Sequence, residues 1–167
     1  MNNFKRWETP VSDADSLAMV SLTDRKNFEI ILQDLRDSKR RRFKFTFEKV
    51  AAYINILEEY RTNETEFPNR KMYGWTIISE NSNWLNNLKQ KEDLLEINNP
   101  NCKHFIIITE DDVIEILCSN FPSVEEIQPA NENEELPGKS TIYYHPKDKE
   151  EIDKLIDDIK KDSQKSG

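Results

Sequence analysis

Hydrophobic and polar residues alternate in short blocks along the chain, and the pattern predicts a sheet accompanied by a few helices. The clearest alternation covers residues 42–48, in which charged or polar residues separate three aromatic ones: Phe43, Phe45 and Phe47. A period of two places these rings on one face of a strand and the polar side chains on the other. Such a strand is typical of an antiparallel sheet with one buried face.

The most hydrophobic run of the protein, Phe105 to Ile108, is short and rich in β-branched residues. It predicts a buried strand at the centre of the sheet. Thr109 follows at the position of a helix N-cap, and Asp112 stands three residues later, as in a capping box. We therefore expect a helix over residues 110–119 that folds its apolar face back onto the strand.

The remaining blocks complete an α+β fold, with two or three helices packed on a mainly antiparallel central sheet. Further strands are expected at residues 28–35, 74–79, 124–127 and 141–144, and also at 53–60, where a helix is the alternative. Further helices are expected at 83–91, capped by Ser82, and at 147–162, which is amphipathic. Residues 1–27 should be a loosely packed N-terminal segment that holds Phe4 and Trp7 against the body, and residues 163–167 a frayed tail. At 167 residues, the chain is expected to form a single domain, 1–167.

Charge is distributed unevenly along the chain. The net charge is −8, yet the stretch from Glu110 to Gly138 alone contains nine acidic residues and no lysine or arginine. An acidic balance disfavours a general nucleic-acid binder, whose surface would be basic. The stretch is either a solvated face with an acidic loop or a surface that meets a basic protein partner. The candidate partner-binding residues are Glu110, Asp111, Glu115, Glu125 and Glu126.

One basic block interrupts the first half of the chain, from Lys39 to Arg42. It could hold a few phosphates of a nucleic acid, but the alternation of the following strand turns the phenylalanines away from the charges. A solvated turn, or an intramolecular partner for the acidic stretch, explains it better.

The usual catalytic and ligand-binding patterns are missing from the sequence. The three glycines are scattered, so no glycine-rich loop can hold a phosphate, and the two histidines and two cysteines lack the spacing of a zinc site. Neighbouring acids such as Asp111 and Asp112 diverge from one another, and Cys118 should be buried. We expect neither an enzyme nor a cofactor or metal.

Cys102 and Cys118 are expected to be reduced, buried thiols. The first residues lack the apolar core of a secretion signal, and no hydrophobic run reaches the length of a membrane span. We therefore expect a cytoplasmic protein without membrane contact.

The order of these features resembles a loosely defined group of small bacterial proteins, some of which are immunity proteins of polymorphic or contact-dependent toxin systems. The similar segments are 42–47, 53–61, 74–85 and 104–117, together covering much of residues 28–127. The resemblance implies a non-enzymatic, cytoplasmic protein that binds and neutralises one cognate toxin domain. The acidic surface could cover the basic cleft of a nuclease toxin, and the chain is expected to be a monomer or homodimer.

Two other interpretations stay open at the level of sequence. The chain could be an adaptor, chaperone or homodimeric accessory protein that uses the apolar stripe from Ile152 to Ile159. It could also be an enzyme whose site forms on folding, with a pocket lined by Tyr53, Glu58 and His104 as the distinguishing feature.

Overall fold

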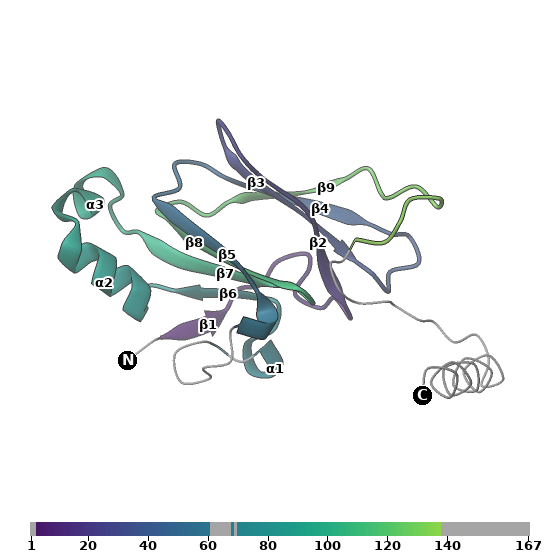
Figure 1. Ribbon diagram of the computed structural model, residues 1–167, viewed down its shortest axis with the longest axis horizontal. Helices are drawn as coiled ribbons and strands as arrows, with labels where there is room; N and C mark the ends of the chain where they lie inside the picture. The colour runs from purple at the N-terminus through teal and green to yellow at the C-terminus, as the bar shows by residue number, and fades with distance from the viewer. Residues whose placement is uncertain (1–2, 61–67, 69, 138–167) are drawn as a thin grey trace, which may run out of the picture.

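The computed structural model describes residues 3–60, 68 and 70–137, which form two antiparallel sheets that face each other (Figure 1). The five strands of sheet A lie in the order β1 (Phe4–Arg6), β6 (Thr76–Ser79), β7 (Lys103–Ile108), β8 (Asp112–Cys118) and β5 (Ala52–Leu57). The four strands of sheet B lie in the order β2 (Leu17–Asp24), β3 (Phe28–Asp34), β4 (Arg42–Phe47) and β9 (Ser123–Ile127). The expected mainly antiparallel fold is confirmed, but its strands are divided between two sheets.

The helices are short. They are η1 (Glu58–Tyr60), α1 (Arg70–Tyr73), α2 (Asn83–Lys91) and α3 (Asp93–Asn98). The helix expected at residues 83–91 is confirmed, and the hydroxyl oxygen of Ser82 accepts a hydrogen bond from the Leu85 backbone N–H at 3.2 Å, as an N-cap does. Among the described residues, no helix is both long and apolar enough to span a bilayer.

The main core lies between the two sheets. Phe43, Phe45 and Phe47 of β4 are each at most 5% exposed and face the inner side chains of β7 and β8. The strand predicted from the alternation in residues 42–48 is therefore confirmed, and so is the prediction that its phenylalanines form the buried face. A second apolar layer covers the outer face of sheet A, where Leu85 of α2 and Leu95 of α3 pack against Leu117.

The central position of residues 105–108 is also confirmed, since β7 is the middle strand of sheet A. The helix expected at 110–119 is wrong, because that segment forms β8 and pairs with β7 through a hairpin. The Thr109 hydroxyl accepts from the Asp112 backbone N–H at 2.9 Å and lies 3.0 Å from the Asp112 carbonyl oxygen. The capping-box-like pair thus closes a turn. All seven residues of β8 are buried, so the broad apolar face read as helical belongs to a strand covered on both sides.

The N-terminal segment 1–27 is more ordered than expected. It contributes β1 and β2, and Val11, Leu17 and Ala18 are each at most 2% exposed. The Trp7 ring packs between the sheets, with its centroid 5.8 Å from Phe45 and 5.2 Å from Phe105. These contacts join residues that are far apart in the sequence and leave no local pattern. The polar residues and Pro10 of this segment therefore indicated a loosely packed segment instead. The elements expected at 141–144, 147–162 and 163–167 lie outside the described residues.

Candidate functional site

The basic block and the acidic stretch meet on sheet B. Strand β9 pairs with β4 so that Glu125 stands opposite Lys44, and the Lys44 ammonium lies 2.6 Å from the Glu125 carboxylate. This ion pair raises the pKa of Lys44, chiefly through the hydrogen bond that the ammonium donates. The expected edge strand at residues 124–127 is confirmed by β9, the last strand of sheet B.

The loop after β9 continues these contacts. The Arg40 guanidinium donates to the carbonyl oxygens of Asn131 and Glu134, and Arg42 pairs with the Glu134 carboxylate. The hydrogen bond from Arg42 lowers the pKa of Glu134. The basic block therefore serves as the intramolecular partner of the acidic stretch, one of the two explanations that its sequence favoured.

Several acids of β9 and its loop remain at the surface after this pairing. We name as the acidic edge the five that are exposed here: Glu125, Glu126, Glu132, Glu134 and Glu135. Glu126, Glu132 and Glu135 form no ion pair with any residue in the described part of the chain. A basic protein surface could therefore contact these three carboxylates without breaking an ion pair among the described residues.

The other candidate partner-binding residues lie elsewhere. Glu110 belongs to the β7–β8 turn, where its carboxylate accepts from the Ser16 hydroxyl at 2.9 Å and lies 3.4 Å from the Arg70 guanidinium. Asp111 and Glu115 are 9% and 5% exposed, so the expectation that the acids of this stretch face solvent is wrong for both. Glu115 is buried because β8 is covered on both faces, whereas Asp111 is buried in the turn that precedes β8. The five predicted residues thus do not form one surface.

Glu115 belongs to a buried polar array that sequence analysis did not find. On the outer face of sheet A, Nδ1 of His104 lies 2.8 Å from the Ser82 hydroxyl, and its Nε2 lies 3.1 Å from the Glu115 carboxylate. The residue types are those of the relay of a serine hydrolase, but the two ring nitrogens are exchanged, since in that relay the serine bonds to Nε2 and the carboxylate to Nδ1. Only the pairing of β7 with β8, together with the start of α2, brings the three residues together.

Burial and hydrogen bonding favour a structural role for this array. Ser82 and His104 are at most 2% exposed, and the serine hydroxyl already caps α2. The rings of Phe4 and Trp84 meet His104 edge-on, at 6.3 and 5.1 Å between centroids. A nucleophile must reach its substrate, and this hydroxyl is enclosed by side chains. The array is best understood as a polar cross-link between α2 and sheet A.

The pocket that would have indicated an enzyme does not form from the residues proposed for it. Tyr53 pairs with Ile116 and packs on Phe28 towards sheet B, whereas His104 pairs with Leu117 on the outer face of sheet A. The sheet therefore separates the two side chains. A shallow hollow of about 400 Å³ does lie between loops at another place, lined mainly by asparagine and lysine residues such as Lys49, Asn101 and Lys103.

Both cysteines are free and buried, as expected. Burial raises the pKa of Cys102 to about 11 and also raises that of Cys118. A thiol that stays protonated is a poor nucleophile and a poor metal ligand. The part of the chain that the structure describes contains no group of three or more histidine, cysteine or acidic side chains placed to hold a metal ion.

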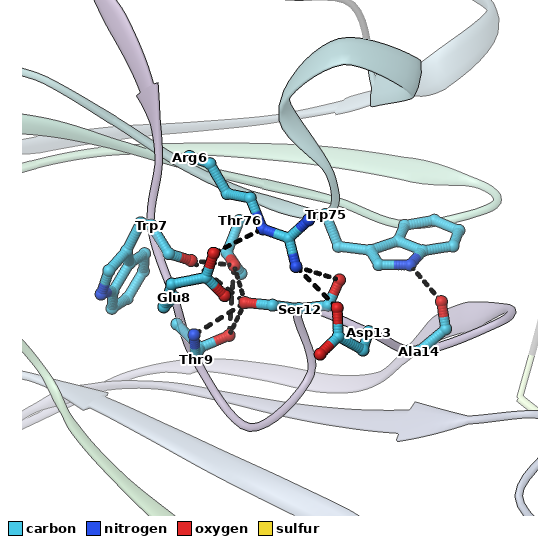
Figure 2. A network of polar contacts seen from close by, with 9 residues as sticks. All are labelled: Arg6, Trp7, Glu8, Thr9, Ser12, Asp13, Ala14, Trp75 and Thr76. Carbon is cyan, nitrogen blue, oxygen red and sulfur yellow. Dashed lines mark hydrogen bonds and ion pairs between the residues drawn. The ribbon is translucent and has the colours of Figure 1, made fainter.

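A polar network near the N-terminus fixes how the two sheets are joined (Figure 2). The Thr76 hydroxyl donates to the Trp7 carbonyl at 2.6 Å, and the Trp75 indole N–H donates to the Ala14 carbonyl at 2.6 Å. Figure 2 also shows Arg6 between two carboxylates, those of Glu8 and Asp13, each at 2.7 Å. The network anchors the connection from β1 to β2, which passes from sheet A to sheet B.

Comparison with known proteins gives no relative from which a role could be transferred: no family model, no curated protein and no solved structure matches the chain.

Proposed function

We propose that this protein is a non-enzymatic, cytoplasmic inhibitor, of the immunity type, that binds and neutralises one cognate bacterial toxin domain without a cofactor. The acidic edge is the surface assigned to the partner, and a nuclease domain, whose cleft is basic, is the class of toxin that would suit it. The observation that carries this proposal is the group of exposed carboxylates on β9 and its loop, Glu126, Glu132 and Glu135, which form no ion pair with another described residue.

Two features of the acidic edge suit a docking surface. It lies on the last strand of sheet B and on the loop that follows, where a partner can approach without disturbing the core. Arg40 and Arg42 hold that loop in place, so its carboxylates are already positioned before binding. Preorganised charge lowers the entropy cost of association and accelerates the encounter with an oppositely charged partner.

The exposure of the candidate partner-binding residues decides which of them the proposal keeps. Glu125 and Glu126 stay in the proposal, whereas Asp111 and Glu115 are too buried to contact a partner. Glu110 is partly exposed but bonded to Ser16 and Arg70. Glu132 and Glu135, which the sequence did not single out, take their place.

The test uses the toxin domain encoded by the neighbouring reading frame. A triple variant Glu126→Lys, Glu132→Lys and Glu135→Lys is compared with a control of equal charge change, Glu59→Lys, Glu80→Lys and Glu92→Lys. The control side chains are exposed in η1, directly after β6, and between α2 and α3. Dissociation constants are measured by calorimetry at two salt concentrations, and growth is followed with both proteins expressed.

We expect the acidic-edge variant to bind at least about a hundredfold more weakly, since three lost attractions of about 1 kcal/mol each amount to roughly two decades in affinity. The control should bind as the natural protein does and still rescue growth. Equal weakening in both triple variants would reject the acidic edge, and the absence of any complex with the natural protein would reject the inhibitor role.

A further inference from the structure

The four strands at the margins of the two sheets differ in how they are protected against pairing with another chain. Strand β1 has only three residues, two of them cationic, and β9 carries two glutamates. Strand β2 has a break in register between Met19 and Ser21. Short length, charge and bulges are the devices by which natural sheets prevent edge-to-edge association.

Strand β5 has none of these devices within its six residues, although the Ala51 N–H just before it donates to the carbonyl of Leu117, the residue that pairs with Ala52. Its six residues, Ala52–Leu57, contain no charge and no proline, and they pair with β8 in an unbroken register. It is the terminal strand of sheet A, and Tyr53 is 40% exposed. An uncharged, regular edge of this length is a template for a further strand.

The register shows which backbone groups point away from β8. The Glu58 backbone N–H donates to the Asp111 carbonyl at 2.9 Å, so residues 52, 54 and 56 also direct their backbone groups towards β8. Tyr53, Asn55 and Leu57 therefore direct theirs outward. No other strand in the described part of the chain pairs with this edge.

We propose that this edge pairs with the β5 edge of a second copy of the chain, antiparallel and about a two-fold axis at Asn55. This register opposes the outward groups of Tyr53 to those of Leu57 of the second copy, and those of Asn55 to their own counterparts. Each outward N–H then meets a carbonyl, giving about six main-chain hydrogen bonds. The result is one sheet that runs through both copies.

The side chains of β5 suit this self-pairing. Tyr53 stands beside Leu57 of the second copy on one face, and Ile54 stands beside Ile56 of the second copy on the other. Apolar cross-strand pairs stabilise a sheet, and the uncharged strand brings no like charges together. A two-fold pairing uses the same patch on both copies and therefore closes at a dimer.

This inference is independent of the proposed inhibitor role. Strand β5 belongs to sheet A and the acidic edge to sheet B, so a dimer would leave both acidic edges available to partners.

The first test is sedimentation velocity of the full chain from low to high micromolar concentration, for the natural protein and for two variants. Asn55→Pro removes an outward N–H and no bond to β8, and proline is tolerated on edge strands. Asn55→Ala is the matched control, because it shortens the same side chain and keeps the N–H. We expect a concentration-dependent dimer for the natural protein and Asn55→Ala, and at least tenfold weaker association for Asn55→Pro.

Amide hydrogen exchange of the natural protein supplies a second test that needs no variant. The amides of Tyr53, Asn55 and Leu57 should become protected as concentration rises, while those of Ile54 and Ile56 are protected throughout. A monomer at all concentrations, open-ended oligomers, or a dimer that Asn55→Pro leaves intact would overturn the proposal. Outward amides that are protected in the monomer would show that the chain covers its own edge. Outward amides protected only when a toxin domain is added would assign the edge to that partner.

Discussion

The hydroxyl of Thr76 is the most informative single group to remove, because it ties the N-terminal connection to sheet A. Thr76 is 1% exposed, its hydroxyl donates to the Trp7 carbonyl at 2.6 Å, and it lies 3.1 Å from the Thr9 hydroxyl. Thr76→Val keeps the shape and the strand preference of the side chain while removing these polar contacts. Among the described side chains, the Ser12 hydroxyl, at 3.2 Å, would then remain as the donor to the Trp7 carbonyl.

The size of the effect follows from this geometry. A buried polar group that loses its partner costs about 1–3 kcal/mol, and the remaining Ser12 contact places the expected loss of unfolding free energy near the middle, at about 2 kcal/mol. For a chain of this length, such a loss lowers the melting temperature by about 4–8 °C. Thr46→Val is the control, since Thr46 lies on the outer, half-exposed face of β4 and should change the unfolding free energy by less than about 0.5 kcal/mol.

The assay is urea denaturation followed by tryptophan fluorescence and circular dichroism, with Thr76→Ser as a variant that retains the hydroxyl. We expect Thr76→Ser to recover part of the stability that Thr76→Val loses. If Thr76→Val and Thr46→Val have the same unfolding free energy, the network in Figure 2 does not hold the two sheets together in the way described.

Three further outcomes follow from buried groups. Phe105→Ala should lower the unfolding free energy by about 3–5 kcal/mol in urea denaturation, because its fully buried ring contacts Trp7 and Phe47; a loss below about 1 kcal/mol would contradict its central position. Ser82→Ala removes both the cap of α2 and the hydroxyl beside His104, so it should cost about 1–3 kcal/mol and speed amide exchange in α2; unchanged exchange there would argue against the cap. The raised pKa of Cys102, about 11 against 9.0 in an exposed thiol, means that the unfolded chain ionises first. Stability should therefore fall as pH rises through that interval, and titration of Cys102→Ala should show a shallower fall.

The sequence was sufficient to predict β4 and the start of α2, because each is marked by a pattern of neighbouring residues. The alternation around Phe45 gave β4 and its buried face, and Ser82 gave the start of α2. The failure at residues 110–119 has a physical reason, because a Thr-x-x-Asp pair satisfies backbone groups in a hairpin turn as well as at a helix start. The β-branched residues Val113, Ile114 and Ile116 favour a strand there, and this signal was outweighed by the apparent cap.

The site could be predicted only in part, since it depends on strand pairing. The sequence showed the residues of the acidic edge as part of a run of acids, and it predicted that Lys44 lies on the outward face of its strand. The order of the strands in each sheet determines that Lys44 meets Glu125 and that Glu115 faces His104. A single sequence without strand register cannot supply that information.

The threading of the first strand into sheet A has a consequence for the order of events during synthesis. The Trp7 carbonyl accepts a hydrogen bond from Thr76, which is synthesised 69 residues later, and Arg42 pairs with Glu134, which is synthesised 92 residues later. A ribosome therefore releases the N-terminal strand long before its neighbour β6 exists. Sheet A stays incomplete until β8 has emerged, and sheet B until β9 has emerged. Folding that depends on such distant partners is slow, because loops must close before contacts can stabilise them. The nascent chain would carry unpaired strand edges throughout this interval, and such edges are prone to aggregate.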